Sequence, residues 1–325
     1  MLDAALEGGY AFPAVNVTSS QTLNGALRGF SDAGADGIVQ ATVGGAAYAG
    51  GGDAAAGARA LAAFAREVAE RHPGNVALHT DHCPPEHVDT FLRPLLDESA
   101  RRVAKGEPPL FNSHMFDGST LPLEENLRVA AELLEECGEL GIVLEIECGV
   151  VGGEEDGIGG DVEADRLYTT TEDLLRVAEV LGTGERGRYL LAATFGNVHG
   201  VYAPGHVQLR PEILREGQEA LAHGRFAYVF HGSSGTSAEQ LAEAVSYGVV
   251  KVNVDTDLQY AFTRAVADHV LKHYDGVLRV DGGVGDKRAY DPRAWGLEAE
   301  ASMAERVAQA CRELGSARRS VRSGG

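Results

Sequence analysis

The segment Val76-Ala-Leu-His-Thr-Asp-His82 runs from apolar residues to a carboxylate and an imidazole, and two prolines follow one residue later. This order predicts a strand that delivers both groups to one rim of a sheet. Two later apolar runs also end in histidine followed by glycine, at His199 and at His231. Neutral imidazoles are good zinc ligands, and three of them leave a coordination position open for a substrate. Three strand ends therefore predict a catalytic zinc site.

Strand-like and helix-like segments alternate along the whole chain. Eight such units without a break in composition predict a (β/α)₈ TIM barrel. The main alternative is a doubly wound open sheet. That fold usually has a glycine-rich motif after its first strand, and Val15-Asn-Val-Thr-Ser-Ser20 contains none. The predicted strands are Ala11–Val17, Gly37–Thr42, Val76–Asp81, Leu110–Met115, Ile142–Cys148, Tyr189–Phe195, Phe226–His231 and Val249–Val254.

The composition narrows the class of protein further. The 325 residues carry a net charge of −20, which argues against nucleic acid or an anionic membrane as a partner. A small anionic substrate stays compatible with this charge, because a metal ion and a few local cations can reverse the field inside a cleft. The four cysteines form no CxxC pair, and no segment reads as a signal peptide or a membrane span. We therefore expect a cytoplasmic protein.

The chain is expected to form a single domain over residues 1–325. Two segments exceed what a plain barrel needs. Val150–Tyr168 is a long, acidic and glycine-rich loop of the kind that often forms a lid. The stretch from about 276 to 315 predicts a C-terminal helical arm that packs on the barrel or reaches a neighbouring subunit. The basic residues 316–325 are expected to be a frayed tail.

Several polar residues near the predicted rim have more than one interpretation. The three histidines are alternatively half-buried side chains that bond only to backbone. Asp81 either orients an imidazole or serves as a general acid or base. His79 shares a face with Asp81 in a regular strand and is more consistent with a packed or supporting residue than with a ligand.

Acidic and small residues follow three other predicted strands. Glu145 and Glu147 share one strand face, and burying both is costly unless they meet a metal ion or an arginine. The acidic run in 152–157 is either a solvated loop or a mobile loop that carries a base. The loops after the seventh and eighth strands predict a phosphate site, although Asp255 could instead be only a helix N-cap.

Together these segments resemble the class II fructose-1,6-bisphosphate aldolases, and more specifically their class IIA branch. The resemblance covers essentially the whole chain, and its blocks occur in family order. The segments that carry it are Thr80-Asp-His-Cys83, Leu144-Glu-Ile-Glu-Cys-Gly149, Gly152-Gly-Glu-Glu-Asp-Gly157, Thr194-Phe-Gly-Asn-Val-His-Gly-Val-Tyr202, Val229-Phe-His-Gly-Ser-Ser-Gly235, Tyr247-Gly-Val-Val-Lys-Val-Asn-Val-Asp-Thr-Asp257 and Tyr290-Asp-Pro-Arg293.

The resemblance implies a zinc-dependent cleavage of fructose 1,6-bisphosphate to dihydroxyacetone phosphate and glyceraldehyde 3-phosphate, by a homodimer. It implies that Glu155 moves the proton next to the ketone, that Asp81 protonates the aldehyde oxygen in the condensation direction, and that Asn253 holds the ene-diolate. The implied zinc ligands are His82, His199 and His231. The resemblance also implies carboxylates at a second divalent metal ion, namely Asp117, Glu147 and Glu154. The carbonyls implied at a K⁺ or Na⁺ ion are those of Val198, Gly200 and Gly232. The implied substrate-binding residues are Asn24, Thr42, Gly200, Gly232, Ser234, Asn253, Asp255, Thr256 and Arg293.

Four residues depart from the pattern of this branch, and all four bear on phosphate binding. They are Val43, Ala203, His206 and Ser233. Two alternatives to the main hypothesis follow from these departures. One is an aldolase for tagatose 1,6-bisphosphate or another ketose phosphate, because one hydroxyl distinguishes the epimers. The other is a weakened paralogue that binds a metal ion or a sugar phosphate without turnover.

Overall fold

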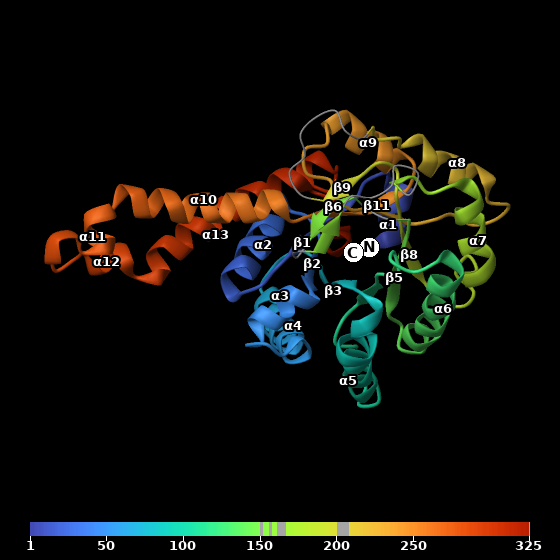
Figure 1. Ribbon diagram of the computed structural model, residues 1–325, viewed down its shortest axis with the longest axis horizontal. Helices are drawn as coiled ribbons and strands as arrows, with labels where there is room; N and C mark the ends of the chain where they lie inside the picture. The colour runs from blue at the N-terminus through green and yellow to red at the C-terminus, as the bar shows by residue number, and fades with distance from the viewer. Residues whose placement is uncertain (150–151, 156–157, 161–166, 200–207, 325) are drawn as a thin grey trace.

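The computed structural model describes residues 1–149, 152–155, 158–160, 167–199 and 208–324, and the side chains of 152–155, 158–160, 198–199 and 323–324 lie outside that description. In the described residues, eight parallel strands close into a barrel in the order β1-β11-β10-β8-β5-β4-β3-β2 (Figure 1). The predicted TIM barrel is confirmed. Its strands are β1 (Phe12–Asn16), β2 (Gly37–Thr42), β3 (Val76–Cys83), β4 (Ser113–Phe116), β5 (Val143–Cys148), β8 (Tyr189–Ala193), β10 (Tyr228–Phe230) and β11 (Val249–Val254).

Helices surround the barrel and alternate with its strands. Several of them start at a capping residue. Before α9, for example, Ser237 accepts from the backbone N–H of Gln240, whose side chain accepts from the Ser237 N–H in return. The helices are α1 (Leu2–Gly8), α2 (Ser20–Ala33), α3 (Val43–Ala49), α4 (Ala54–Ala69), α5 (Arg93–Val103), α6 (Leu123–Glu139), α7 (Thr171–Leu181), α8 (Glu212–Ala220), α9 (Ala238–Ser246), α10 (Thr256–Lys272), α11 (Tyr274–Leu278), α12 (Lys287–Tyr290) and α13 (Pro292–Glu313).

The interior of the barrel changes character from one end to the other. At the amino ends of the strands it is apolar, and the side chains of Phe12, Leu190 and Val250 pack there against helix α1. Towards the carboxyl ends the buried side chains become polar and charged; they include His79, Asp81, Glu145, Lys251 and Asn253. Burying so many charges is tolerated only where they pair with one another. The carboxyl rim is therefore the place for chemistry, as in other barrels of this type.

Helices α10 to α13 form the predicted arm. Helix α10 runs outward from the barrel, α11 and α12 lie at the tip, and α13 returns to pack on α2 and α10 (Figure 1). Close packing against α2 is possible because Gly25 and Gly29 leave room for Met303 and Val307 of α13. The arm begins earlier than the sequence predicted, because α10 itself carries the chain away from the barrel.

The C-terminal segment is held against the barrel, in contrast to the expected frayed tail. The Ser320 hydroxyl and the Val321 N–H both donate to the buried carboxylate of Asp36, at 2.7 and 2.9 Å. Arg319 donates to the Gly8 carbonyl and lies over the Tyr10 ring. These contacts lie at the amino ends of the strands, so this segment and α1 close the same end. Within the described residues, no helix is long and apolar enough to cross a membrane.

Candidate metal and catalytic site

The end of strand β3 is distorted so that neighbouring side chains face the same way. In a regular strand Asp81 and His82 would point to opposite faces. Here the pairing of β3 with β4 shifts register between Thr80 and Cys83, and His82 has a φ of 39°. A bulge of this kind re-aims a side chain, and a left-handed backbone at a histidine is a strained conformation typical of functional sites. Both Asp81 and His82 thus reach the inner side of the rim.

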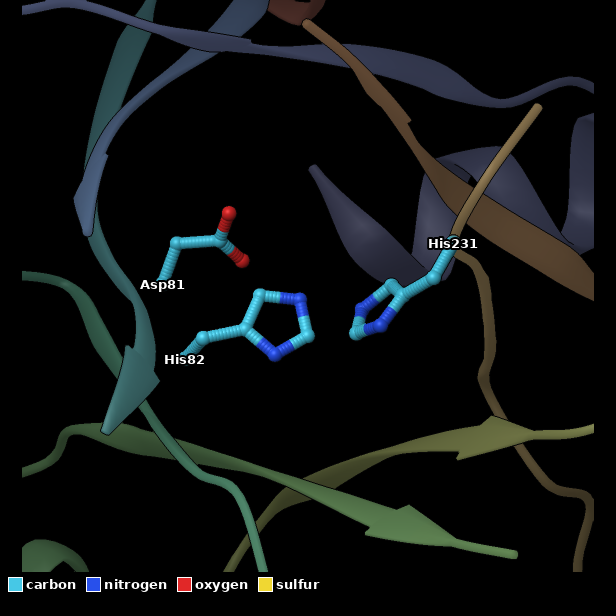
Figure 2. Close-up of side chains that lie close together, drawn as sticks. All are labelled: Asp81, His82 and His231. Atoms are coloured by element: carbon cyan, nitrogen blue, oxygen red, sulfur yellow. The ribbon is translucent and has the colours of Figure 1, made fainter. Parts of the chain in front are cut away.

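His231 meets this pair from the opposite side of the barrel (Figure 2). It follows β10 directly, and the centroids of the His82 and His231 rings are 4.7 Å apart. Ligand atoms of Asp81, His82 and His231 all lie within 4.8 Å of one another. The structure therefore brings two of the three predicted zinc ligands together with the predicted acid/base carboxylate.

Carboxylates surround the outer side of the His82 ring. Its Nδ1 lies 2.8 Å from Asp117 Oδ2 and 3.9 Å from Glu147 Oε2. Burial alone would raise the pKa of Asp117, but its hydrogen bond to His82 lowers that pKa well below the usual range. A carboxylate on one ring nitrogen is the usual support of a metal-binding histidine, which then binds through the other nitrogen. His82, Asp117 and Glu147 also form a second group with metal-ligating spacing.

His231 is fully buried between two glutamates of β5. Its Nε2 lies 2.8 Å from Glu145 Oε1, and its Nδ1 lies 3.2 Å from Glu147 Oε2. Burial would lower the pKa of His231, but the hydrogen bonds to Glu145 and Glu147 raise it to about 9. The imidazole therefore holds an extra proton at neutral pH when no metal ion competes for it.

The counter-ion of Glu145 is a lysine, whereas the sequence suggested a metal ion or an arginine. Lys251 Nζ lies 3.0 Å from Glu145 Oε2, and both side chains are buried. His79 Nε2 is 3.3 Å from the same carboxylate oxygen. Burial, and next the charge of Lys251, lower the pKa of His79 well below its ordinary value. His79 is accordingly a neutral supporting residue, in agreement with its interpretation from the sequence.

Asp81 is positioned by three amide side chains. Asn253 Nδ2 donates to Asp81 Oδ1 at 3.1 Å, while Asn16 and Gln40 donate to Oδ2 at 3.1 and 2.8 Å. Neither Asn16 nor Gln40 was predicted as a site residue from the sequence. The signal for both was a polar side chain at an inward position near the end of an otherwise apolar strand.

The acidic loop after β5 lies beside the third predicted zinc ligand. Strand β6 (Gly152–Glu155) pairs in parallel with β9 (Val198–His199), with Gly153 opposite His199, and β7 (Ile158–Gly160) pairs with the other edge of β6. The backbone thus brings the segment of Glu154 and Glu155 next to that of His199. The side chains of these residues and of Val198, and all of Gly200, lie outside the described part of the structure.

The loops after β10 and β11 contain the predicted phosphate residues. Gly232 has a φ of 62°, which glycine adopts without strain. The Ser233 hydroxyl, which is one departure from the family pattern, donates to the Asn253 carbonyl at 2.8 Å and so ties the two loops together. Asp255 precedes α10 but makes no side-chain cap, which removes the simple N-cap interpretation. Ser234 lies in the first loop, and Thr256 is the first residue of α10.

The remaining predicted substrate residues lie at different distances from this centre. Thr42 ends β2 at the rim, and its hydroxyl accepts from the Gly45 N–H to start α3, where Val43 is the first residue. Asn24 lies on α2, with its amide 3.5 Å from Glu300 of α13. The Arg293 side chain is 86% exposed on the arm and pairs with Asp291 at 2.6 Å. Ala203 and His206 lie outside the described residues.

A parallel barrel whose rim gathers imidazoles and carboxylates defines a barrel enzyme with a candidate metal centre. The sequence matches the family described as "Fructose-bisphosphate aldolase class-II" over residues 1–319. It is 55% identical to a fructose-bisphosphate aldolase of Mycobacterium leprae, over 99% of this chain and 96% of that protein. It is 57% identical to one of Streptomyces galbus, over 98% and 95%. A crystal structure of fructose-bisphosphate aldolase from Campylobacter jejuni has a TM-score of 0.85 and 35% identity, and covers 98% of this chain and 93% of that one. The chain belongs to the class II fructose-bisphosphate aldolase family.

Proposed function

We propose that this enzyme is a zinc-dependent aldolase that reversibly cleaves fructose 1,6-bisphosphate to dihydroxyacetone phosphate and glyceraldehyde 3-phosphate, in the cytoplasm. The observation that carries the proposal is the convergence of Asp81, His82 and His231 at the rim. Family membership and the names of the relatives support the substrate. The described donors fit a zinc ion, because Asp117 supports one ring nitrogen of His82 and the ligand atoms of Asp81, His82 and His231 lie within 4.8 Å of one another. At His231 the ion would take the place of one of the two glutamate contacts.

His82 and His231 hold the zinc ion in this proposal, together with His199. When bound, the metal ion polarises the ketone of the substrate and so makes the adjacent carbon–carbon bond easier to break. In the metal-free protein the buried carboxylates of Glu145 and Glu147 orient His231 and balance its charge. Asp117 and Glu147, with Glu154, are the candidates for a second divalent metal.

Two carboxylates move the protons. In cleavage, Asp81 accepts the proton of the hydroxyl on C4, the bond between C3 and C4 breaks, and the aldehyde product forms. Glu155 then donates a proton to C3 of the resulting ene-diolate, which gives dihydroxyacetone phosphate; condensation reverses both steps. Asn253 is well placed for holding the ene-diolate, because its amide already points at Asp81.

The phosphates are assigned to separate sets of residues. We assign Ser234, Asp255 and Thr256 to one phosphate, with a K⁺ or Na⁺ ion held by the carbonyls of Val198, Gly200 and Gly232. The start of α10 supports this assignment, because a helix N-terminus favours an anion. Asn24, Thr42 and Arg293 belong to the other phosphate. The class IIA branch is part of this proposal, on the strength of the acidic loop and the arm.

The position of Arg293 favours a homodimer. Arg293 is the second residue of α13, and this helix starts next to α12 at the tip of the arm in Figure 1, away from the barrel. A contact with a phosphate at the rim is therefore more easily made across an interface, to the barrel of a second copy. Large apolar side chains exposed on the arm would be covered by that copy; they are Tyr260, Leu271, Tyr274, Leu278, Val284, Tyr290 and Leu297.

Replacing Arg293 with alanine is expected to raise KM for the bisphosphate about 10- to 100-fold, because a guanidinium fork binds phosphate oxygens through charge-assisted hydrogen bonds. Zinc content should not change. Proton exchange of dihydroxyacetone phosphate should change much less, since that half-reaction uses the other phosphate site. Steady-state cleavage and exchange assays measure both effects, with Arg288→Ala on the same arm as the matched control. An equal loss in both assays would assign Arg293 to the fold or to the shared site.

Subunit mixing tests whether Arg293 acts across the interface. Arg293→Ala and His82→Ala homodimers should both be nearly inactive at a bisphosphate concentration well below the KM of Arg293→Ala. A mixed dimer contains one active centre with intact His82 and an intact arginine from the other copy, so mixing should restore up to about half of the activity per centre. Sedimentation should show a dimer throughout. Lack of restoration in verified mixed dimers would place Arg293 at its own barrel.

The metal affinity should depend on pH in one direction. Because the pKa of His231 is raised to about 9 in the metal-free protein, a bound zinc ion has to displace a proton below that pH. The affinity should therefore rise about tenfold per pH unit from pH 7 to 9 and level off above. Competition with a chelator of known pH dependence measures this, and Glu145→Gln should move the plateau to lower pH. An affinity that is constant from pH 7 to 9 would contradict the expectation.

Cleavage of fructose 1,6-bisphosphate and tagatose 1,6-bisphosphate, assayed side by side with and without a chelator, tests the main proposal. We expect chelator-sensitive cleavage with a preference for the fructose epimer. Preference for the tagatose epimer would support the sister activity. Zinc and sugar-phosphate binding without cleavage of either compound would support the weakened paralogue.

A further inference from the structure

A lysine lies at the centre of the polar half of the barrel, between the metal side and the substrate side of the site. Lys251 of β11 is 0% exposed. Its Nζ contacts Glu145 Oε2 at 3.0 Å and Oε1 at 3.2 Å, and it donates to Asn253 Oδ1 at 2.6 Å. A buried ammonium ion is costly to keep in a protein interior unless its partners are fixed. The ammonium of Lys251 is therefore kept in the interior by contacts with two other residues of the site, Glu145 and Asn253.

The first consequence concerns the side-chain amide of Asn253. A lysine ammonium can only donate hydrogen bonds, so it selects the oxygen of the amide. The amide nitrogen is then turned the other way, where it donates to Asp81 Oδ1 at 3.1 Å. In the flipped orientation, the N–H groups of Asn253 would face the ammonium of Lys251, and its oxygen would face the carboxylate of Asp81. Both contacts would be repulsive. Lys251 and Asp81 together leave one favourable orientation, which presents an N–H donor at the rim.

The second consequence concerns Glu145 and the histidine in front of it. Glu145 Oε1 lies 2.8 Å from His231 Nε2 while the same carboxylate contacts Lys251. Without a cation behind it, a buried carboxylate lacks a fixed partner on that side and no longer holds the imidazole in one position. Lys251 thus fixes the position of Glu145 and, through Glu145, the ring of His231.

We propose that Lys251 is a positioning residue for the aldol reaction. Its ammonium fixes the amide of Asn253 on one side and the carboxylate of Glu145 on the other, and it touches no reacting atom itself. The inference rests on the proposed aldolase activity and adds to it the link between the ene-diolate site and the metal site. Lys251 contacts Asn253 and Glu145 at the same time, so neither of these two residues can take over its role.

The test begins with Lys251→Met, which removes the charge and keeps most of the side-chain volume. We expect kcat to fall about 10- to 100-fold, the range for residues that support those in direct contact with the metal or substrate. KM should stay within about threefold, because the phosphate contacts are intact. Zinc affinity, measured with a chelator above pH 9 where a proton on His231 no longer competes, should fall as well, since Glu145 no longer fixes the His231 ring. Lys105→Met, in the exposed turn after α5, is the matched control and should leave all three values unchanged.

A double-mutant cycle separates positioning from general damage. If Lys251 acts through the amide, then at saturating zinc, where weaker metal binding adds no loss, Lys251→Met combined with Asn253→Ala should reduce kcat no more than the worse single change. Losses that multiply would overturn the proposal, as would full kcat in Lys251→Met. Where Lys251→Met leaves Glu145 too poorly compensated to fold, the same cycle is run in Glu145→Gln, which carries no charge to compensate. If the unmodified protein cleaves no ketose bisphosphate, the proposed function is refuted. If it does cleave one, but the losses of kcat from Lys251→Met and Asn253→Ala multiply, only the role proposed for Lys251 is refuted.

Discussion

Replacing His82 with alanine should remove bound zinc and lower the rate of bisphosphate cleavage about 10³-fold or more. Losing one of three imidazoles leaves two protein ligands, which is too few for a tightly held catalytic zinc. A catalytic metal supplies several kcal/mol of transition-state stabilisation, and each 1.4 kcal/mol is tenfold in rate. Elemental analysis and cleavage assays on the same samples measure the two losses together. His199→Ala should behave alike, although its side chain lies outside the described structure.

The backbone at His82 provides a control for misfolding. Because its φ of 39° is strained for alanine but natural for glycine, His82→Gly should unfold at a higher Tm than His82→Ala while also lacking zinc. The exposed His223 is the matched histidine, and His223→Ala should retain zinc and activity. A well-folded His82→Gly protein with normal zinc content would remove His82 from the ligand set.

Replacing Glu155 with alanine should reduce proton exchange of dihydroxyacetone phosphate with solvent about 10²- to 10⁴-fold, the usual contribution of one general base. Zinc should remain bound, since Glu155 is not among the proposed ligands. Exchange can be followed by NMR in D₂O, independently of cleavage.

The neighbouring Glu154 offers a comparison within the same strand, because we assign it to a second metal ion instead. Glu154→Ala should retain considerably more exchange than Glu155→Ala. Near-normal exchange in Glu155→Ala, or an equal loss in both variants, would show that another group carries the proton.

The barrel was predictable because its signals are local. Apolar runs of strand length alternate with amphipathic helices, and β2 and β11 have the bounds expected from the sequence. The predicted fold class and family are confirmed. The kink at His82 was not predictable, because nothing in Thr80-Asp-His-Cys83 distinguishes a bulged strand from a regular one. Its position depends on how β4 pairs with β3, which is a tertiary contact.

The residues of the candidate site were largely predictable from the sequence, but the contacts between them were less so. Residue type and position at strand ends selected Asp81, His82 and His231, which the structure brings together. The partner of Glu145 could not be inferred, since Lys251 lies 106 residues further along the chain and meets it only when the barrel closes. The roles assigned to Glu155, His199 and Arg293 stay predictions.

The docked C-terminal segment determines how the enzyme can be handled. Arg319 and Ser320 hold the end of the chain beside α1, at the opposite end of the strands from the rim. Figure 1 shows both ends of the chain next to each other near the barrel axis. Protein tethered to a solid support through either end would therefore turn its rim towards the solution. Substrate would reach an immobilised layer of this aldolase by diffusion from above, without the support in its path.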